Sequence, residues 1–241
     1  CKQAQEIPSY ENTFRRMHLN QKTTTAEKCI PMDQWDACKR DVKLDTFAGR
    51  ECYGGLDIGA ISDLTAFDLL FPHDDSETIE VPLAHGDEAA DQETTTRTVR
   101  RRTYTGFTWF WMPENPVKRD SRMTAQIDAW RRQGFIRTTP GNTVDYEQVL
   151  DEIIEIIEPF SLMGIAFDKG FQGVQFGTNL IAHLGDERVR YFSQGILSMA
   201  PPFRELLELL AAGRMHHDGN PVMRWMAANT MGERRGGLLK P

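Results

Sequence analysis

The chain has 241 residues, of which 28 are Lys or Arg and 35 are Asp or Glu, so its formal net charge at pH 7 is -7. Hydrophobic residues make up 40% of the sequence and charged residues 26%, which is typical of a globular protein with one full core plus appendages. No stretch approaches the roughly 20 uninterrupted apolar residues of a membrane-spanning helix, so we expect no membrane partner. The acidity argues against a surface that binds nucleic acid everywhere, but it is compatible with a local basic groove.

The beginning of the chain has Cys1 instead of Met and shows no signal-peptide pattern, so we expect a piece of a longer chain. Its four cysteines lie in the first quarter of the sequence without the CxxC spacing of zinc sites: Cys1, Cys29, Cys38 and Cys52. This pattern favours free thiols in a reducing compartment over a disulfide framework.

Residues 1–50 are polar and interrupted by prolines, and we expect them to form a lead-in segment that packs on a main domain spanning 51–241. That domain begins with strands predicted at 52–58, 64–71 and 107–112, joined into a three-stranded antiparallel sheet. The intervening residues 73–106 are first acidic and Thr-rich and then basic, and their apolar residues follow neither a strand period of 2 nor a helix period of 3.6 for long. They predict an inserted hairpin or mobile loop.

After the third strand the pattern changes to alternating helices and strands. Helices are predicted at 123–133, from Thr143 or Asp145 to Pro159, at 174–184 and at 202–212; strands are predicted at 163–167 and 188–192. Three hairpin-joined strands followed by this alternation predict an α/β fold, with a mixed sheet and helices on both of its faces.

Two acidic residues end short apolar strands. Asp57 lies within Gly54–Gly59, and Asp168 follows Gly164–Phe167. Burying a carboxylate costs several kcal/mol unless a cation or hydrogen bonds compensate, although Asp57 could simply cap the following turn. Because ligands of open sheets gather at the carboxyl ends of strands, we expect both acids to converge there and to hold Mg²⁺ or Mn²⁺.

Other candidates are more ambiguous. Asp63 opens the second strand and could hold the metal directly, hold it through water, or only cap the turn. His216, His217 and Asp218 look like a metal triplet, but neighbouring residues of an extended segment point to opposite faces, so a surface turn is the favoured interpretation.

A basic cluster follows the acidic part of the insert, at Arg97, Arg100, Arg101 and Arg102. It could contact DNA phosphates, or it could be a solvated loop that balances the acidic stretch before it. The Trp109 and Trp111 side chains share one face of a strand and are interpreted as core.

Together these strings resemble the C-terminal nuclease domain of the large terminase subunit of tailed bacteriophages. The resemblance covers most of the chain except 73–106, and the residues that carry it are Thr13–Arg16, Leu19–Asn20, Trp35, Cys38, Gly55–Gly59, Ser62–Ala66, Phe167–Asp168, Gly195, Leu197–Ser198, Pro201, His217, Gly219–Val222, Arg224–Met226 and Asn229.

The resemblance implies an RNase H-like fold and a metal-dependent endonuclease that cuts concatemeric double-stranded DNA with two Mg²⁺ or Mn²⁺ ions. The family's catalytic acids fall on Asp57 and Asp168, with Asp63 as the auxiliary acid. The implied partners are the ATPase domain of the same full-length chain, the small terminase subunit and the portal protein, in the cytoplasm of an infected or lysogenic bacterium. The family's third acid lies in a helix with no match before Pro241, and Asp218 is not favoured as its substitute.

Two alternatives compete with this hypothesis. Leu56–Gly59 also resembles the phosphate loop of actin-like and sugar-kinase-like ATP-binding folds, although Asp168–Gly170 is only a partial match to their second D-x-G strand. The chain could also be a non-catalytic module that docks on DNA or the portal. No Walker motif occurs in the sequence, so we expect no translocating ATPase activity.

Overall fold

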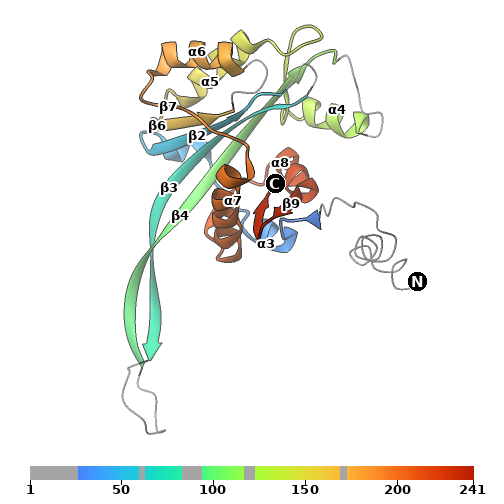
Figure 1. Cartoon of the computed structure of the whole chain (residues 1–241). Coiled ribbons are helices and arrows are strands. Elements are labelled where there is room, and N and C mark those ends of the chain that lie inside the picture. The colour runs from blue at the N-terminus through green and yellow to red at the C-terminus, as the bar shows by residue number, and fades with distance from the viewer. Residues whose placement is uncertain (1–26, 60–62, 83–93, 117–122, 169–172) are drawn as a thin grey trace, which may run out of the picture.

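The computed structural model describes residues 27–59, 63–82, 94–116, 123–168 and 173–241 (Figure 1). Within these residues a seven-stranded sheet is built from β2 (Glu51–Asp57), β3 (Thr65–Pro82), β4 (Thr94–Pro113), β5 (Arg137–Thr139), β6 (Ser161–Phe167), β7 (Val189–Tyr191) and β8 (Met215–His217). A smaller three-stranded sheet is formed by β1 (Glu27–Lys28), β9 (Met231–Arg235) and β10 (Leu238–Lys240). The α-helices are α3 (Met32–Ala37), α4 (Thr124–Arg132), α5 (Tyr146–Ile157), α6 (Gly173–Leu184), α7 (Ile196–Ala211) and α8 (Pro221–Asn229).

The larger sheet has the order β5-β4-β3-β2-β6-β7, with β8 beside β4. β3 is antiparallel to both β2 and β4, whereas β6 is parallel to β2 and β7 is parallel to β6. The predicted mixed sheet, with three hairpin-joined strands followed by alternating helices and strands, is therefore confirmed. None of the helices in the described part of the chain is long and apolar enough to cross a membrane.

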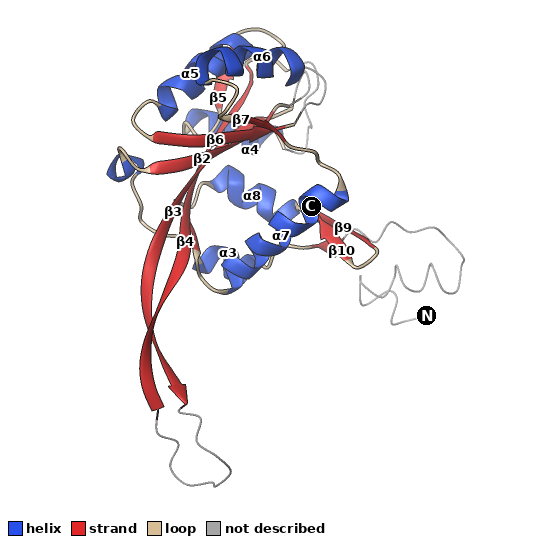
Figure 2. Cartoon of the chain, turned by 60° about the vertical axis from the view of Figure 1, so that its left-hand side comes forward, coloured by secondary structure: helices blue, strands red, loops and turns tan. Residues whose placement is uncertain are grey.

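The hairpin of β3 and β4 is much longer than the two strands predicted at 64–71 and 107–112, and those lengths were wrong. Pairing continues from Thr65 opposite Trp111 to Pro82 opposite Thr94, so the hairpin projects from the body as a two-stranded arm (Figures 1 and 2). Its distal part has no core to face, so its sequence lacks the apolar alternation of a half-buried strand. β-Branched Thr and Val residues still favour extended backbone there. The centre of the insert, 83–93, lies outside the described residues.

One face of the sheet is covered by α5 and α6 (Figure 2). α5 begins after Asp145, whose side chain accepts hydrogen bonds from the backbone N–H groups of Glu147 (3.0 Å) and Gln148 (3.2 Å), so Asp145 and not Thr143 is the cap. The core on this face joins Val149 and Ile153 of α5 to strand residues such as Phe67 and Trp111. The predicted core position of Trp111 is confirmed.

The opposite face carries two smaller apolar clusters around α8. Phe110 and Trp130 pack on Val222 in one, and Trp35 and Cys38 from the lead-in segment pack on α7 and α8 in the other. Cys29, Cys38 and Cys52 are free thiols, as predicted, and Cys1 lies outside the described residues.

Two helix boundaries near the C-terminal end of the sequence differ from the prediction. α7 begins at Ile196 and contains Pro201 and Pro202, because its first turn is already closed by bonds from Ser198 and Met199 to the Gly195 carbonyl. The turn expected near Asp218 leads directly into α8, a helix that was not predicted from the sequence.

Candidate metal centre

Side chains along β2 and β6 point alternately to the two faces of the sheet, and this decides on which face the acids at the ends of these strands lie. Leu56 of β2 pairs with Phe167 of β6, and both side chains are buried in the core beneath α5 and α6. The next residue along the chain is Asp57, the last of β2, in one case, and Asp168, directly after β6, in the other. Since successive side chains point to opposite faces, the two carboxylates lie side by side on the face that α5 and α6 do not cover. The structure thus brings together the two acids that the sequence singled out.

These two carboxylates influence each other electrostatically. Asp57 remains partly open to solvent, yet the protein atoms around its carboxyl group raise its pKa, and the negative charge of Asp168 raises it further. A like charge at a neighbouring position disfavours ionisation of Asp57 unless a cation lies between the two groups. The pair is therefore arranged to attract positive charge.

A third carboxylate on the same face was not predicted. Asp68 of β3 pairs with Gly55 of β2, which is two residues before Asp57, and with Thr108 of β4. The Thr108 hydroxyl donates a hydrogen bond to Asp68 Oδ1. Burial raises the pKa of Asp68 to about 6, with a smaller contribution from the charge of Asp57. The signal was present in the sequence, since Asp68 interrupts the apolar run Phe67–Phe71 just as Asp57 interrupts its own.

Asp63 lies elsewhere, at the beginning of β3. The Tyr146 hydroxyl at the start of α5 donates to the Gly59 carbonyl (2.6 Å), and burial followed by the charge of Asp63 raises the Tyr146 pKa. A side chain at Gly59 would meet the Leu64 carbonyl oxygen at 2.5 Å, so only glycine fits this turn. Residues 60–62 lie outside the described residues. The charge of Asp63 thus acts on Tyr146, next to the turn that follows Asp57.

His216 and His217 occupy neighbouring strand positions and point to opposite faces, as expected. His217 is buried and stacks on Trp35 with 4.6 Å between ring centroids; its Nε2 bonds the Trp35 carbonyl (2.9 Å), and its Nδ1 accepts from the Gly219 N–H (3.1 Å). Both ring nitrogens are thus occupied by backbone groups. Asp218 Oδ1 accepts from the Asn220 N–H (2.9 Å) in the turn before α8. This arrangement is a structural turn and not a metal triplet.

Comparison with known proteins identifies the family. Residues 104–239 match the family model of the terminase large subunit, endonuclease domain. The chain belongs to this family. It is 31% identical over 232 residues to the terminase large subunit of Enterobacteria phage HK97, covering 96% of this chain and 40% of that protein. It is 28% identical over 233 residues to protein YmfN of Escherichia coli (strain K12), covering 92% of this chain and 45% of that protein.

A solved structure supports the same assignment. The crystal structure of the HK97 bacteriophage large terminase matches with a TM-score of 0.67 and 30% identity, over 99% of this chain and 44% of that one. The mixed sheet is therefore the RNase H-like fold of a terminase nuclease domain. The chain spans less than half the length of the relatives it matches.

Terminase nuclease domains generally depend on divalent metal ions, and the acids of this chain fit such an ion chemically. Asp57 and Asp168 offer hard oxygen donors of the kind that Mg²⁺ and Mn²⁺ prefer, and burial and the charge of Asp168 raise the pKa of Asp57, a cost that a cation would offset. Across the described residues, however, no group of three or more His, Cys, Asp or Glu side chains forms a ready-made metal cluster. The geometry therefore supports a carboxylate pair as the centre of the site.

The basic cluster of this terminase domain lies on the arm. Arg97, Arg100, Arg101 and Arg102 are all residues of β4. Arg102 Nε lies 3.6 Å from Asp74 Oδ1, and both side chains are exposed. Arg100 and Arg102 have the same strand parity as Thr108, which places them on the face of the carboxylates. Arg102 and Thr108 are six positions apart, a distance of roughly 20 Å along β4.

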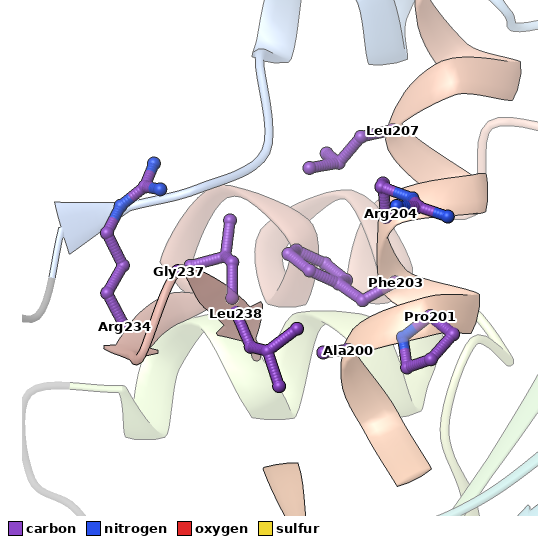
Figure 3. A pocket seen from close by; sticks show the side chains of 9 residues that line it. Ala200, Pro201, Phe203, Arg204, Leu207, Arg234, Gly237 and Leu238 are labelled. Carbon is purple, nitrogen blue, oxygen red and sulfur yellow. The ribbon is translucent and has the colours of Figure 1, made fainter. Parts of the chain in front are cut away.

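A separate apolar cavity lies between α7 and the hairpin of β9 and β10 (Figure 3). It has a volume of about 300 Å³, and Phe203, Leu207 and Leu238 line it together with Arg204 and Arg234. Because its lining contains no carboxylate, this cavity does not contribute to the metal centre.

Proposed function

We propose that this chain is a metal-dependent endonuclease that cuts concatemeric double-stranded DNA by two-metal phosphodiester hydrolysis. The observation that carries the proposal is the position of Asp57 and Asp168, each one residue beyond the Leu56–Phe167 pair, in a chain of the terminase endonuclease family. The register of β2 and β6 supports the pairing, and the charge of Asp168 on Asp57 supports a cation between them.

In this proposal Asp57 and Asp168 hold the divalent cations through their carboxylate oxygens. When bound, the cations would supply Lewis-acid activation of water and stabilisation of the departing 3′ oxygen. Tyr146 and Gly59 fix the turn that follows Asp57, and Asp63 lies beside that turn as an auxiliary acid. The polypeptide thus supplies a fixed pair of acids for the cations.

The arm adds basic residues to the proposed site. Arg100 and Arg102 share the face of the carboxylates, and Arg97 and Arg101 are further basic residues of β4. At the base of the arm a hollow of about 470 Å³ is lined by Arg102, Arg204 and Arg214, together with two glutamates of α7. Clustered guanidinium groups of this kind suit contacts with DNA phosphates.

The partners follow from the family and belong to the same proposal. We expect residues 51–241 to act as the nuclease domain, with 1–50 as a lead-in. They would work with the ATPase domain of a full-length terminase, the small subunit and the portal protein. The packing of Trp35 and Cys38 on α7 and α8 supports a lead-in that is attached to the domain.

Plasmid nicking in Mn²⁺ or Mg²⁺ tests the proposal. Asp57→Asn and Asp168→Asn should each abolish nicking, because each removes one of the paired ligands. Asp151→Asn is the matched control, since Asp151 is an exposed acid on α5, on the opposite side of the sheet, and should leave nicking unchanged. Nicking that survives both Asp57→Asn and Asp168→Asn would overturn the proposal.

Two other results would favour the alternatives. ATP binding measured by calorimetry would favour the actin-like fold, and DNA binding without cleavage would favour a docking module.

A further inference from the structure

Asp68 has no role in the proposed pair of ligands, yet it occupies a costly position. It lies in the central strand β3 between Phe67 and Leu69, whose side chains are 0% exposed on the α5 and α6 side of the sheet. Alternation therefore places the Asp68 carboxylate on the same face as Asp57. A carboxylate surrounded by protein is destabilising unless cations or hydrogen bonds compensate.

The position next to Asp68 contains no side chain that could separate it from Asp57. Its partner on β2 is Gly55, and a Cβ atom placed on Gly55 would lie 3.9 Å from the Asp68 Cβ. Asp57 is two residues further along β2 on the same face, which makes Asp57 and Asp68 diagonal neighbours, roughly 7 Å apart. The acids Asp168, Asp57 and Asp68 thus form a row across β6, β2 and β3.

The far side of Asp68 is fixed by hydrogen bonds. The Thr108 hydroxyl donates to Asp68 Oδ1, and the Thr108 carbonyl accepts from Asn220 Nδ2 (3.2 Å). Asn220 in turn caps α8 by accepting from the N–H groups of Val222 (2.9 Å) and Met223 (3.3 Å). The Asp68 carboxylate is therefore held in one orientation by a chain of contacts that leads to a helix terminus.

Building on the proposed function, we propose that Asp68 is a positioning residue for the cation site, acting through Asp57 to hold the divalent ions. Its negative charge lies on the side of Asp57 opposite to Asp168, so three acids and not two would balance the charge of the cations. In this role Asp68 acts as a charged neighbour of Asp57 and not as a ligand itself. Thr108 keeps the Asp68 carboxylate in place.

Asp68→Asn separates this role from a purely structural one. The variant keeps the shape of the side chain and can still accept from Thr108, but it loses the charge. We expect Mn²⁺ affinity, measured by calorimetry, to fall by about tenfold to a hundredfold, as is typical when an outer-shell partner of a metal ligand is lost. In EDTA the thermal midpoint of the variant should rise, because repulsion with Asp57 is relieved. A purely structural role predicts a lower midpoint in EDTA and unchanged Mn²⁺ affinity.

Thr108→Val provides a second measurement if Asp68→Asn does not fold. It leaves the charge of Asp68 but removes its hydroxyl donor, and it should also weaken Mn²⁺ binding, by less than Asp68→Asn. Asp151→Asn should bind Mn²⁺ like the wild-type chain.

Unchanged Mn²⁺ affinity in both Asp68→Asn and Thr108→Val would overturn the role of Asp68. If Asp57→Asn still abolishes nicking in that case, the proposed function stands alone, whereas a wild-type chain that binds no Mn²⁺ would overturn both.

Discussion

The two faces of the large sheet use the same strands for opposite purposes. Under α5 and α6, Leu56, Phe67 and Phe167 form a closed apolar core. On the other face, Asp57, Asp68 and Asp168 stand within one residue of those positions along the same strands. Alternation along a strand therefore lets a tightly packed core hold an unfavourable cluster of acids in fixed positions. The face under α5 and α6 therefore supplies the larger apolar core, whereas the opposite face holds the acids beside smaller apolar clusters.

The charged face should have a pH dependence that the apolar face lacks. Burial raises the pKa of Asp68 from an ordinary value of 3.8 to about 6 in the folded state, so between these values the folded state binds more protons than the unfolded state. Stability in EDTA should therefore fall as pH rises through this window, by about 3 kcal/mol at most.

Urea unfolding of the wild type and of Asp68→Asn at several pH values between 4 and 7 would measure this effect. The variant should gain stability relative to the wild type as the pH rises. Because the pKa of Asp57 is also raised, the stability of the variant should still fall with pH, but less than that of the wild type. If the free energies of unfolding of the two proteins differed by the same amount at every pH, the titration of Asp68 would not be the source of the pH dependence.

Gly54 and Gly55 are adjacent residues that test the two faces directly. A Cβ at Gly54 would lie 2.9 Å from Ile165 Cγ1 and 3.2 Å from Phe67 Cε2, in the closed core, whereas a Cβ at Gly55 would meet only the Asp68 Cβ at 3.9 Å. Gly54→Ala should thus lower the free energy of unfolding by about 1–3 kcal/mol through overpacking. Gly55→Ala should be neutral or slightly stabilising, because glycine within a strand is entropically costly. Equal losses in urea unfolding would contradict the contrast between the faces.

The sequence allowed part of this arrangement to be predicted. Asp57 and Asp168 could be found because each ends an apolar strand, and the carboxyl ends of neighbouring parallel strands meet at one edge. Asp68 required more information, since its proximity to Asp57 depends on the cross-strand register of β2 and β3. A shift of that register by one residue would have turned the Asp68 side chain to the other face.

The underestimated strand lengths of the hairpin and the missed helix α8 have other physical causes. The arm of β3 and β4 is a ribbon without a core, so hydrophobic periodicity carried no information about its length. The sequence Asn220-Pro221 was interpreted as the end of a turn, although a capping Asn followed by Pro at the first helical position also begins a helix, here α8. The choice between the two depends on Val222, which is fully buried against the sheet.

The smallest effect on stability is expected on the arm, where neither core packing nor buried charge contributes. Arg102 and Asp74 form an exposed pair 3.6 Å apart, so Arg102→Ala should change the free energy of unfolding by about 1 kcal/mol or less. Arg102→Ala should have a larger effect on DNA binding than on stability.

Losing one phosphate contact should weaken binding of duplex DNA and reduce the slope of log K against log salt by about 1. Asp74→Asn should strengthen binding, because it removes a competing carboxylate, and Arg188→Ala, an exposed residue before β7, is the matched control. Fluorescence anisotropy across a salt series would measure all three, and an unchanged slope for Arg102→Ala would remove the arm from the DNA-binding surface.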